Sequence, residues 1–302
     1  MDRAESQRVV RYAFRLVDVF SERPLAGNQL AVVLDAEGLG AQRMQAVARE
    51  FNFSETTFVT PSSVAGCDWR VRIFTPNREL PMAGHPTIGT GVVLEAEGRA
   101  REQTVFELGV GPTPVRVRPG WAEMDQRPPT FGLEHPDPAI LAAAISAEPQ
   151  DILATGLPPQ AVGTGLAHLM VPIRSLEAIR RLRPLPDRWD AAMAGLPELA
   201  VYAFAREGQL AGSDAHCRMF APHLGVTEDP ATGSAAGPLA CYLTARTPVG
   251  DGTRAFRFEQ GFEMGRESLL EASVDVSDGV IRAVRVGGSA RIVAAGWLDL
   301  PD

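Results

Sequence analysis

Three polar residues stand beside turns at which acid–base chemistry and anion binding are both possible. Glu55 follows an amphipathic segment, His85 follows Gly84 directly, and Asp229 precedes Pro230. A carboxylate withdrawn from water has a raised pKa and can both take and give a proton near neutral pH. A histidine titrates in the same range and can share that proton. On residue type and spacing alone, a surface acid just past a helix is the better explanation of Glu55, and a structural loop histidine is the better explanation of His85.

Two loops of the sequence are copies of one pattern. Residues 72–76, Arg-Ile-Phe-Thr-Pro, resemble residues 218–222, Arg-Met-Phe-Ala-Pro, and residues 85–90 resemble residues 229–234. An apolar segment with the length of a helix follows each copy. Two strand–loop–helix copies predict two similarly folded domains, related by a pseudo-twofold, whose equivalent loops face one cleft. Two copies at so long a period do not form a solenoid.

Each of these loops has the chemistry of an anion-binding site. Pro86 and Pro230 each fit the first helical position, where the missing N–H of proline costs nothing. A helix N-terminus presents unpaired donors and a partial positive charge, both of which suit a carboxylate. Helix capping alone, with Asp229 as N-cap, is the alternative for a single copy, whereas two matched copies favour binding. Glycines that let backbone N–H groups approach a ligand occur at Gly84, Gly89 and Gly233.

Composition narrows the class of protein. The chain has 302 residues, 45% of them hydrophobic, which is enough for two domains of ordinary size. Its formal net charge is −8, whereas wide contact with nucleic acid or an anionic membrane needs a basic patch. We find no glycine-rich nucleotide motif, no apolar run of membrane-spanning length and no signal-peptide core, and we therefore expect a cytoplasmic protein.

The densest run of prolines lies in the middle of the chain, at residues 126–138. Proline extends neither a helix nor a central strand, so this run is the best candidate for a linker between domains. Apolar periodicity predicts helices over residues 41–51, 86–96, 176–182 and 230–244. Strands are expected over residues 16–20, 31–34, 56–60, 71–74, 104–108, 113–118, 121–125, 167–173, 200–205, 214–220 and 254–259, with at least two more over 280–298.

Several of these stretches resemble the PhzF family of phenazine biosynthesis. Residues 51–59, Phe-Asn-Phe-Ser-Glu-Thr-Thr-Phe-Val, resemble its Asn-x-Ser-Glu-Thr-x-Phe signature, residues 79–89 its Gly-His loop, and residues 228–235 its second loop. Ala83, where a cysteine is common, and Glu267, where proline is expected, depart from the family pattern. The resemblance extends from about residue 14 to residue 298, with shorter matches at Asp18-Val19-Phe20, Gly27-Asn28, Gln260-Gly261, Met264-Gly265-Arg266 and Val286-Gly287-Gly288.

The resemblance implies an α/β fold of the diaminopimelate-epimerase type. Such a fold has two pseudo-symmetric domains, each a mixed sheet wrapped around a central helix, and its last strand returns to the first domain. The first domain would then comprise residues 1–127 with residues 286–302, and the second would comprise residues 128–285. The resemblance also implies a homodimer that needs no cofactor.

The same resemblance implies roles for individual residues. The catalytic glutamate of the family matches Glu55, and His85 and Asp229 match the other polar groups at the reacting centre. Metal is not expected, because these three residues have no recognisable ligand spacing. The implied function is an isomerase that shifts a proton on a small cyclic or allylic carboxylic acid. The substrate carboxylate would be held by backbone N–H groups of Gly84, His85, Gly233 and Ser234.

Two other functions stay open at this point. One is epimerisation of an amino or hydroxy acid by the same three polar residues, and the other is a non-catalytic scaffold that binds a small anion. Epimerases of this fold use one thiol in each glycine-rich loop, and neither matching loop here contains a cysteine. The cysteines of this chain fit no zinc or redox motif, so we expect reduced thiols at Cys67, Cys217 and Cys241.

Overall fold

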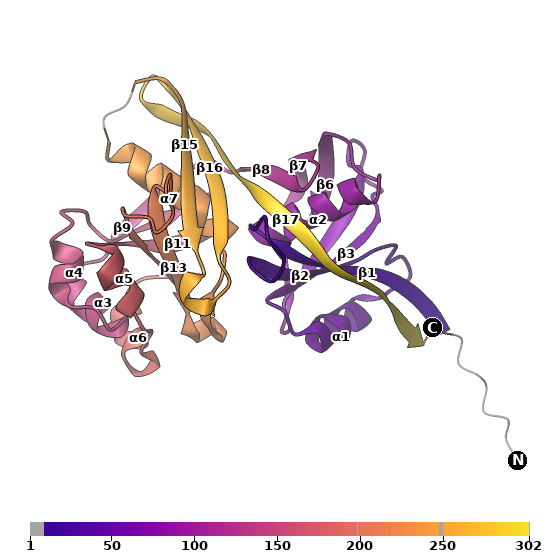
Figure 1. Ribbon diagram of the computed structural model, residues 1–302, viewed down its shortest axis with the longest axis horizontal. Coiled ribbons are helices and arrows are strands. Elements are labelled where there is room, and N and C mark those ends of the chain that lie inside the picture. Colours follow the sequence, from indigo (N-terminus) through magenta and orange to yellow (C-terminus); the bar gives the residue numbers. More distant parts are fainter. Residues whose placement is uncertain (1–8, 198, 248–249, 302) are drawn as a thin grey trace, which may run out of the picture. The chain divides into compact units, whose positions relative to one another are not determined.

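The computed structural model describes residues 9–197, 199–247 and 250–301 (Figure 1). The chain divides into two compact units. The first unit comprises residues up to 19, residues 29–122 and residues from 290 onward, and the second comprises residues 20–28 and 123–289. The polar residues 1–11 were expected to be loose, but residues 9–11 belong to a strand, β1 (Val9–Val19), where they pair with residues 299–301; residues 1–8 lie outside the described residues. No helix in the described part of the chain is long and apolar enough to cross a membrane.

The first unit is built around the helix α2 (Gly84–Ala96). Residues 84–94 of this helix are all buried, as expected for a helix that is apolar on every side. In the sheet of this unit β2 is parallel to β3, β4 is antiparallel to both β3 and β5, and β6 is parallel to β4 and antiparallel to β7. These strands are β2 (Asn28–Val33), β3 (Glu55–Pro61), β4 (Trp69–Phe74), β5 (Glu79–Leu80), β6 (Gln103–Leu108) and β7 (Gly111–Arg118).

A second helix, α1 (Ala41–Phe51), confirms the amphipathic pattern of the sequence. Its buried residues Met44, Val47 and Ala48 pack in one cluster with Phe58 and Phe74. The helix ends at Phe51, and the left-handed backbone of the C-cap residue Asn52 (φ 52°) stops further helical hydrogen bonding. The turn that follows leads directly into β3.

The two ends of the described chain meet in the first unit. Strand β1 (Val9–Val19) is antiparallel to the last part of β17 (Val280–Pro301), with Val9 opposite Pro301 and Val19 opposite Ala290. The yellow and indigo ribbons run side by side over this stretch in Figure 1. The last strand therefore contributes its final residues to the first unit.

The second unit repeats the order of strand pairing of the first. β11 is parallel to β12, β13 is antiparallel to both β12 and β14, and β15 is parallel to β13 and antiparallel to β16. The central helix of this unit, α7 (Gly233–Ala245), is also buried on all sides. The strands are β10 (Gln160–Gly163), β11 (Ala167–Ile173), β12 (Ala200–Ala205), β13 (Ala215–Ala221), β14 (Val226–Asp229), β15 (Gly252–Gln260) and β16 (Ser268–Ser277).

Four short helices share a separate core cluster in the second unit. Leu141, Ile179 and Trp189 are fully or almost fully buried in this cluster. Asp137 and Ser175 cap two of these helices by accepting hydrogen bonds from backbone N–H groups. The four helices are α3 (Pro138–Ala144), α4 (Pro149–Leu153), α5 (Leu176–Arg181) and α6 (Pro186–Met193). Of these, only α5 was expected from the sequence.

The proline-rich run at residues 126–138 is not a linker. It contains β9 (Thr130–Glu134), which pairs antiparallel with β10, and it follows β8 (Trp121–Gln126). The prolines flank β9 and do not interrupt it, so its ladder hydrogen bonds can form. The two units divide before this run, at residues 122 and 123.

Residues 20–28 belong to the second unit, not to the first as the sequence suggested. Hydrogen bonds with the end of the loop of residues 261–267 and with the start of β16 hold this segment. Leu269 N donates to Phe20 O at 2.8 Å, and Gly27 N donates to Glu267 O at 3.1 Å. No sequence pattern marks these contacts, because the partners lie far apart along the chain.

Candidate functional site

Glu55 is the first residue of β3, in a register that places it beside Leu30 of β2. The β-branched and aromatic residues that follow it are buried and favour a strand. The Glu55 side chain is itself only 16% exposed. One of its oxygens, Oε2, lies 3.5 Å from Nε2 of His85, whose side chain is 6% exposed. The first unit therefore brings together the predicted glutamate and the predicted histidine.

The protonation of Glu55 is set chiefly by burial. Loss of solvent raises its pKa from 4.5 to about 7, and a hydrogen bond with Ser54 opposes that shift. Among the described residues, Oε2 of Glu55 has no hydrogen-bond partner within bonding distance. Both protonation states are therefore populated near neutral pH, which is the condition for a group that takes and returns a proton.

Helix α2 begins at Gly84, two residues earlier than the sequence suggested. Pro86 is consequently the third helical residue, and Ala83 occupies the N-cap position. Gly84 and His85 are the first two residues of the helix, where backbone N–H groups have no carbonyl partner within the helix. Gly84 and His85 thus lie at the start of α2, with His85 beside Glu55, and anion binding by their N–H groups stays a prediction.

Helix α7 begins at Gly233, three residues later than its predicted start, and Thr232 is the N-cap residue. Asp229 is therefore not an N-cap, and Pro230 does not lie in the helix. Gly233 and Ser234 are the first two residues of α7, as Gly84 and His85 are in α2. By helix position, His85 therefore corresponds to Ser234. The sequence repeat aligned Pro86 with Pro230 and therefore paired His85 with Asp229. Pro86 lies inside α2, whereas Pro230 precedes α7, so this alignment does not match the starts of the two helices.

Asp229 ends β14 and is held by a buried polar network. Its Oδ1 accepts a hydrogen bond from Nδ2 of Asn28 at 2.9 Å, and its Oδ2 accepts one from Oγ1 of Thr232 at 2.5 Å. Nε2 of Gln260 donates to the backbone oxygen of Asp229 at 2.7 Å, and Oε1 of Gln260 accepts from Tyr202 at 3.0 Å. Donors to both carboxylate oxygens fix the orientation of this side chain.

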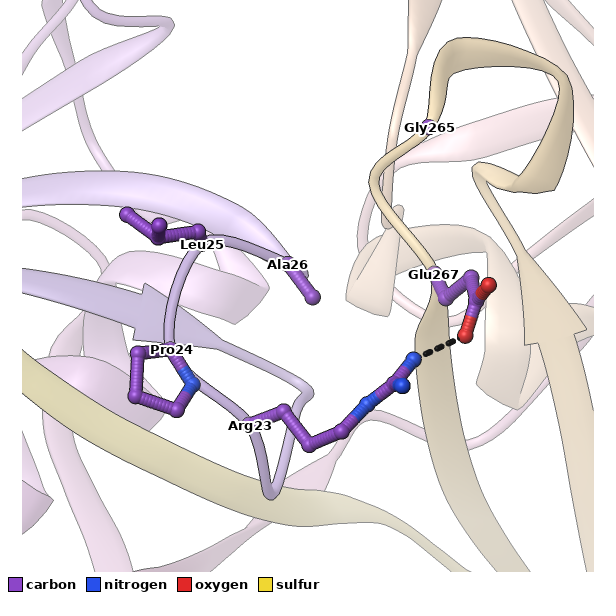
Figure 2. A pocket seen from close by; sticks show the side chains of 6 residues that line it. All are labelled: Arg23, Pro24, Leu25, Ala26, Gly265 and Glu267. Atoms are coloured by element: carbon purple, nitrogen blue, oxygen red, sulfur yellow. Dashed lines mark hydrogen bonds and ion pairs between the residues drawn. The ribbon is translucent and has the colours of Figure 1, made fainter.

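The loop that carries Asn28 is fastened to the segment at residues 265–267. Arg23 and Glu267 both line a small cavity of about 200 Å³, and Figure 2 shows the ion pair that joins them. The guanidinium of Arg266 donates to the backbone oxygens of Ala26 and Gly27 at 2.8 and 2.9 Å. Glu267, one of the two departures from the family pattern, therefore takes part in holding the loop.

Each unit contains half of the site residues that were predicted from the sequence. Glu55, Gly84 and His85 lie together in the first unit, and Asp229, Gly233 and Ser234 lie together in the second. The proximity of His85 to Asp229 stays a prediction.

Four residues around Asp229 and Ser234 were not assigned roles from the sequence. Asn28, Gln260 and Thr232 lie in stretches that match the family but were given no role, and nothing in the sequence marked His168. His168 lies 3.1 Å from the hydroxyl of Ser234. These contacts join residues far apart in the chain, apart from Thr232, whose place in a Thr-Gly-Ser run gave the only local signal.

The two buried cysteines are poorly suited to proton transfer. Cys217 and Cys241 are buried in the second unit, and Cys67 is half-buried in the first. Burial raises the pKa of Cys241 to about 12 and raises that of Cys217 further from its usual range. The thiolate is the reactive form of cysteine, so neither buried thiol can act as a base near neutral pH.

Comparison with known proteins adds to this geometry. A family model described as "Phenazine biosynthesis-like protein" matches residues 17–296. An uncharacterized isomerase of Mesorhizobium japonicum is 38% identical over 296 residues, which cover 94% of this chain and 98% of that protein. The trans-2,3-dihydro-3-hydroxyanthranilate isomerase of Pseudomonas aeruginosa is 37% identical over 291 residues, again covering 94% and 98%.

Solved structures agree with the family match. The PhzF-family phenazine biosynthesis protein of Bacillus anthracis superposes with a TM-score of 0.88 at 25% identity, covering 96% of this chain and 99% of that one. A hydroxyproline epimerase of Agrobacterium vitis superposes with a TM-score of 0.62 at 13% identity, over 98% and 93% of the two chains. The second likeness concerns the mixed α/β fold alone. The chain belongs to the PhzF family of phenazine biosynthesis-like proteins.

Proposed function

We propose that the chain is an isomerase that moves a proton within a small activated carboxylic acid, with Glu55 as the proton carrier. The observation that carries the proposal is a withdrawn carboxylate with a pKa of about 7, lying 3.5 Å from His85. Family membership supports the reaction class, since the 37% identical relative is named trans-2,3-dihydro-3-hydroxyanthranilate isomerase.

The reaction needs no oxidant and no second substrate. Ionised Glu55 takes a proton from a substrate carbon, and the C–H electron pair is delocalised over an adjacent double bond and carbonyl group. Neutral Glu55 then returns a proton to a different carbon of the same conjugated system, so the product has the formula of the substrate. A positioned carboxyl group with a pKa near the working pH suits both steps.

The helix starts supply the groups that bind and orient the substrate. The N–H groups of Gly84 and His85 in one unit, and of Gly233 and Ser234 in the other, are donors for a carboxylate. We propose that Glu55, His85 and Asp229 act on the same substrate molecule. Asp229, held by its own hydrogen bonds, would accept a hydrogen bond from a donor group of that substrate.

The test is proton exchange in heavy water. The purified protein is incubated in D₂O with trans-2,3-dihydro-3-hydroxyanthranilate and with a panel of cyclic and allylic carboxylic acids, and deuterium is located by NMR. We expect deuterium at a carbon different from the one that lost its proton, together with a shifted double bond.

The other outcomes each contradict the proposal in a recognisable way. Deuterium at the carbon that lost its proton, with inverted configuration and no shifted double bond, indicates an epimerase. Binding of a carboxylic acid without any exchange indicates a scaffold. Activity that vanishes with a chelator and returns with one metal ion contradicts a mechanism in which Glu55 suffices.

A further inference from the structure

A buried histidine of the second unit contacts the first turn of α7. His168 lies on β11, where it is paired with Val162 of β10 and Ala200 of β12, and it is only 2% exposed. Its Nε2 lies 3.1 Å from Oγ of Ser234, the second residue of the helix. Because α7 packs against both β10 and β11, the ring is fixed between the sheet and the start of the helix.

The imidazole of His168 is neutral over the working range of pH. Burial lowers its pKa to about 4, so one ring nitrogen carries a hydrogen and the other carries a lone pair. Nδ1 is buried and has no hydrogen-bond partner among the described residues. A buried N–H without an acceptor is rarer and costlier than a buried lone pair without a donor. The hydrogen therefore belongs on Nε2, and Oγ of Ser234 accepts it.

This arrangement decides what the Ser234 hydroxyl can do. A hydroxyl group has one hydrogen to donate, and the contact with His168 uses a lone pair of the oxygen. The hydroxyl hydrogen stays available for an acceptor at the start of the helix, beside the N–H groups of Gly233 and Ser234. Nε2 of Gln126 donates to the backbone oxygen of Gly233 at 3.1 Å, so the first turn is held from a second side.

We propose that His168 is a positioning residue that makes the Ser234 hydroxyl a hydrogen-bond donor to the carboxylate of the substrate. This inference rests on the proposed function, in which the start of α7 binds that carboxylate. It adds a third donor to the two backbone N–H groups, and it assigns the buried histidine a task that a merely structural residue would not have.

The direct test is the tautomer of His168. The full chain has five histidines, so ¹⁵N-labelled histidine gives a small set of ring signals, and the His168→Gln variant identifies those of His168. We expect a protonated Nε2 and an unprotonated Nδ1, unchanged between pH 6 and pH 9. A neutral ring with its hydrogen on Nδ1 and none on Nε2 would show that Ser234 donates to His168 and would overturn the proposal.

The second test measures anion affinity with benzoate as the probe, followed through the backbone signals of Gly233 and Ser234. Loss of one hydrogen bond to a charged group predicts binding weaker by about 10-fold to 100-fold in Ser234→Ala. His168→Phe should weaken binding in the same direction, and the double variant should bind no more weakly than Ser234→Ala alone. His168→Gln, which keeps a side-chain N–H donor, should recover part of the loss.

Independent, additive effects of the two substitutions would show that His168 does not act through Ser234. Absence of benzoate binding by the unmodified protein would refute the anion-binding role of the hydroxyl. Neither readout involves turnover, so both hold or fail separately from the role of Glu55. Conversely, full turnover by Glu55→Gln would refute the proposed isomerase while leaving the tautomer result unchanged.

Discussion

Replacing Glu55 with glutamine should stabilise the folded protein at alkaline pH. A carboxyl group whose pKa is raised on folding binds more protons in the folded state than in the unfolded state between the two pKa values. The wild-type protein therefore loses stability as the pH rises from about 4.5 to about 7, and no further through this group above that range. Glutamine of similar shape carries no charge, so the variant avoids this loss.

The size of the effect follows from the pKa shift. A rise from 4.5 to about 7 corresponds to roughly 3 kcal/mol of disfavoured ionisation above pH 7. Part of that cost is already present at pH 5, and the 16% exposure of the side chain allows water to screen part of the charge. We expect the stabilisation by Glu55→Gln to be larger at pH 8 than at pH 5 by about 2 kcal/mol.

The assay is urea unfolding of both proteins at pH 5 and pH 8, followed by circular dichroism. Comparison across pH cancels the contributions of the glutamine amide that do not depend on pH. Glu50→Gln, an exposed change on α1, is the matched control for the loss of a carboxylate from the same region of the chain. An effect of Glu55→Gln that is the same at both pH values would refute the claim that Glu55 is held neutral by burial.

Three further substitutions, with Gly91→Ala as the control for one of them, test contacts within the two units. Asn28→Ala removes the donor to Oδ1 of Asp229. It should lower the free energy of unfolding by about 1–3 kcal/mol and should also lower turnover. An unchanged urea midpoint would contradict the role of this hydrogen bond in the network around Asp229. Gly89→Ala places a Cβ 2.6 Å from Leu30 and 2.7 Å from Val19, and this overpacking should lower the free energy of unfolding by about 1–3 kcal/mol. Gly91→Ala, whose Cβ meets its neighbours only at 3.4 Å, should be tolerated. Equal melting temperatures of the two variants would refute this packing. Burial lowers the pKa of His216, but its hydrogen bonds with Glu259 and Glu263 outweigh burial and raise the pKa. The stability it contributes is complete below pH 6.5 and is lost as the pH rises through the folded pKa, so urea midpoints of His216→Gln should lack that loss.

The sequence predicted the elements whose patterns are local. The apolar spacing at residues 41–51 became α1, and the apolar runs after the two loops became α2 and α7. Prolines were the chief source of error, because their effect depends on position. Pro86 is tolerated as the third helical residue, whereas Pro230 stays outside its helix. The prolines at residues 128–138 flank a strand and do not mark a linker.

The residues of the site were predicted unevenly, because only some of them lie in local sequence motifs. Glu55 and His85 lie in local motifs, and the first unit places them 3.5 Å apart. Asp229 has one local contact, with Thr232, and its other contacts come from Asn28 and Gln260, which reach it through the fold. His168 reaches Ser234 from a different strand. No periodicity or spacing in one sequence encodes such long-range pairs, since they depend on how strands and helices pack.

The measurement that tests the central claim most directly is the rate of solvent deuterium incorporation into the substrate by Glu55→Gln. The variant keeps the size of the side chain and should fold and bind the substrate, but it lacks the base. We predict a fall of at least about 10²-fold, typical of a lost general base, while the exposed control Glu50→Gln keeps the wild-type rate. Incorporation by folded Glu55→Gln at the wild-type rate would contradict the role of Glu55 as the proton carrier.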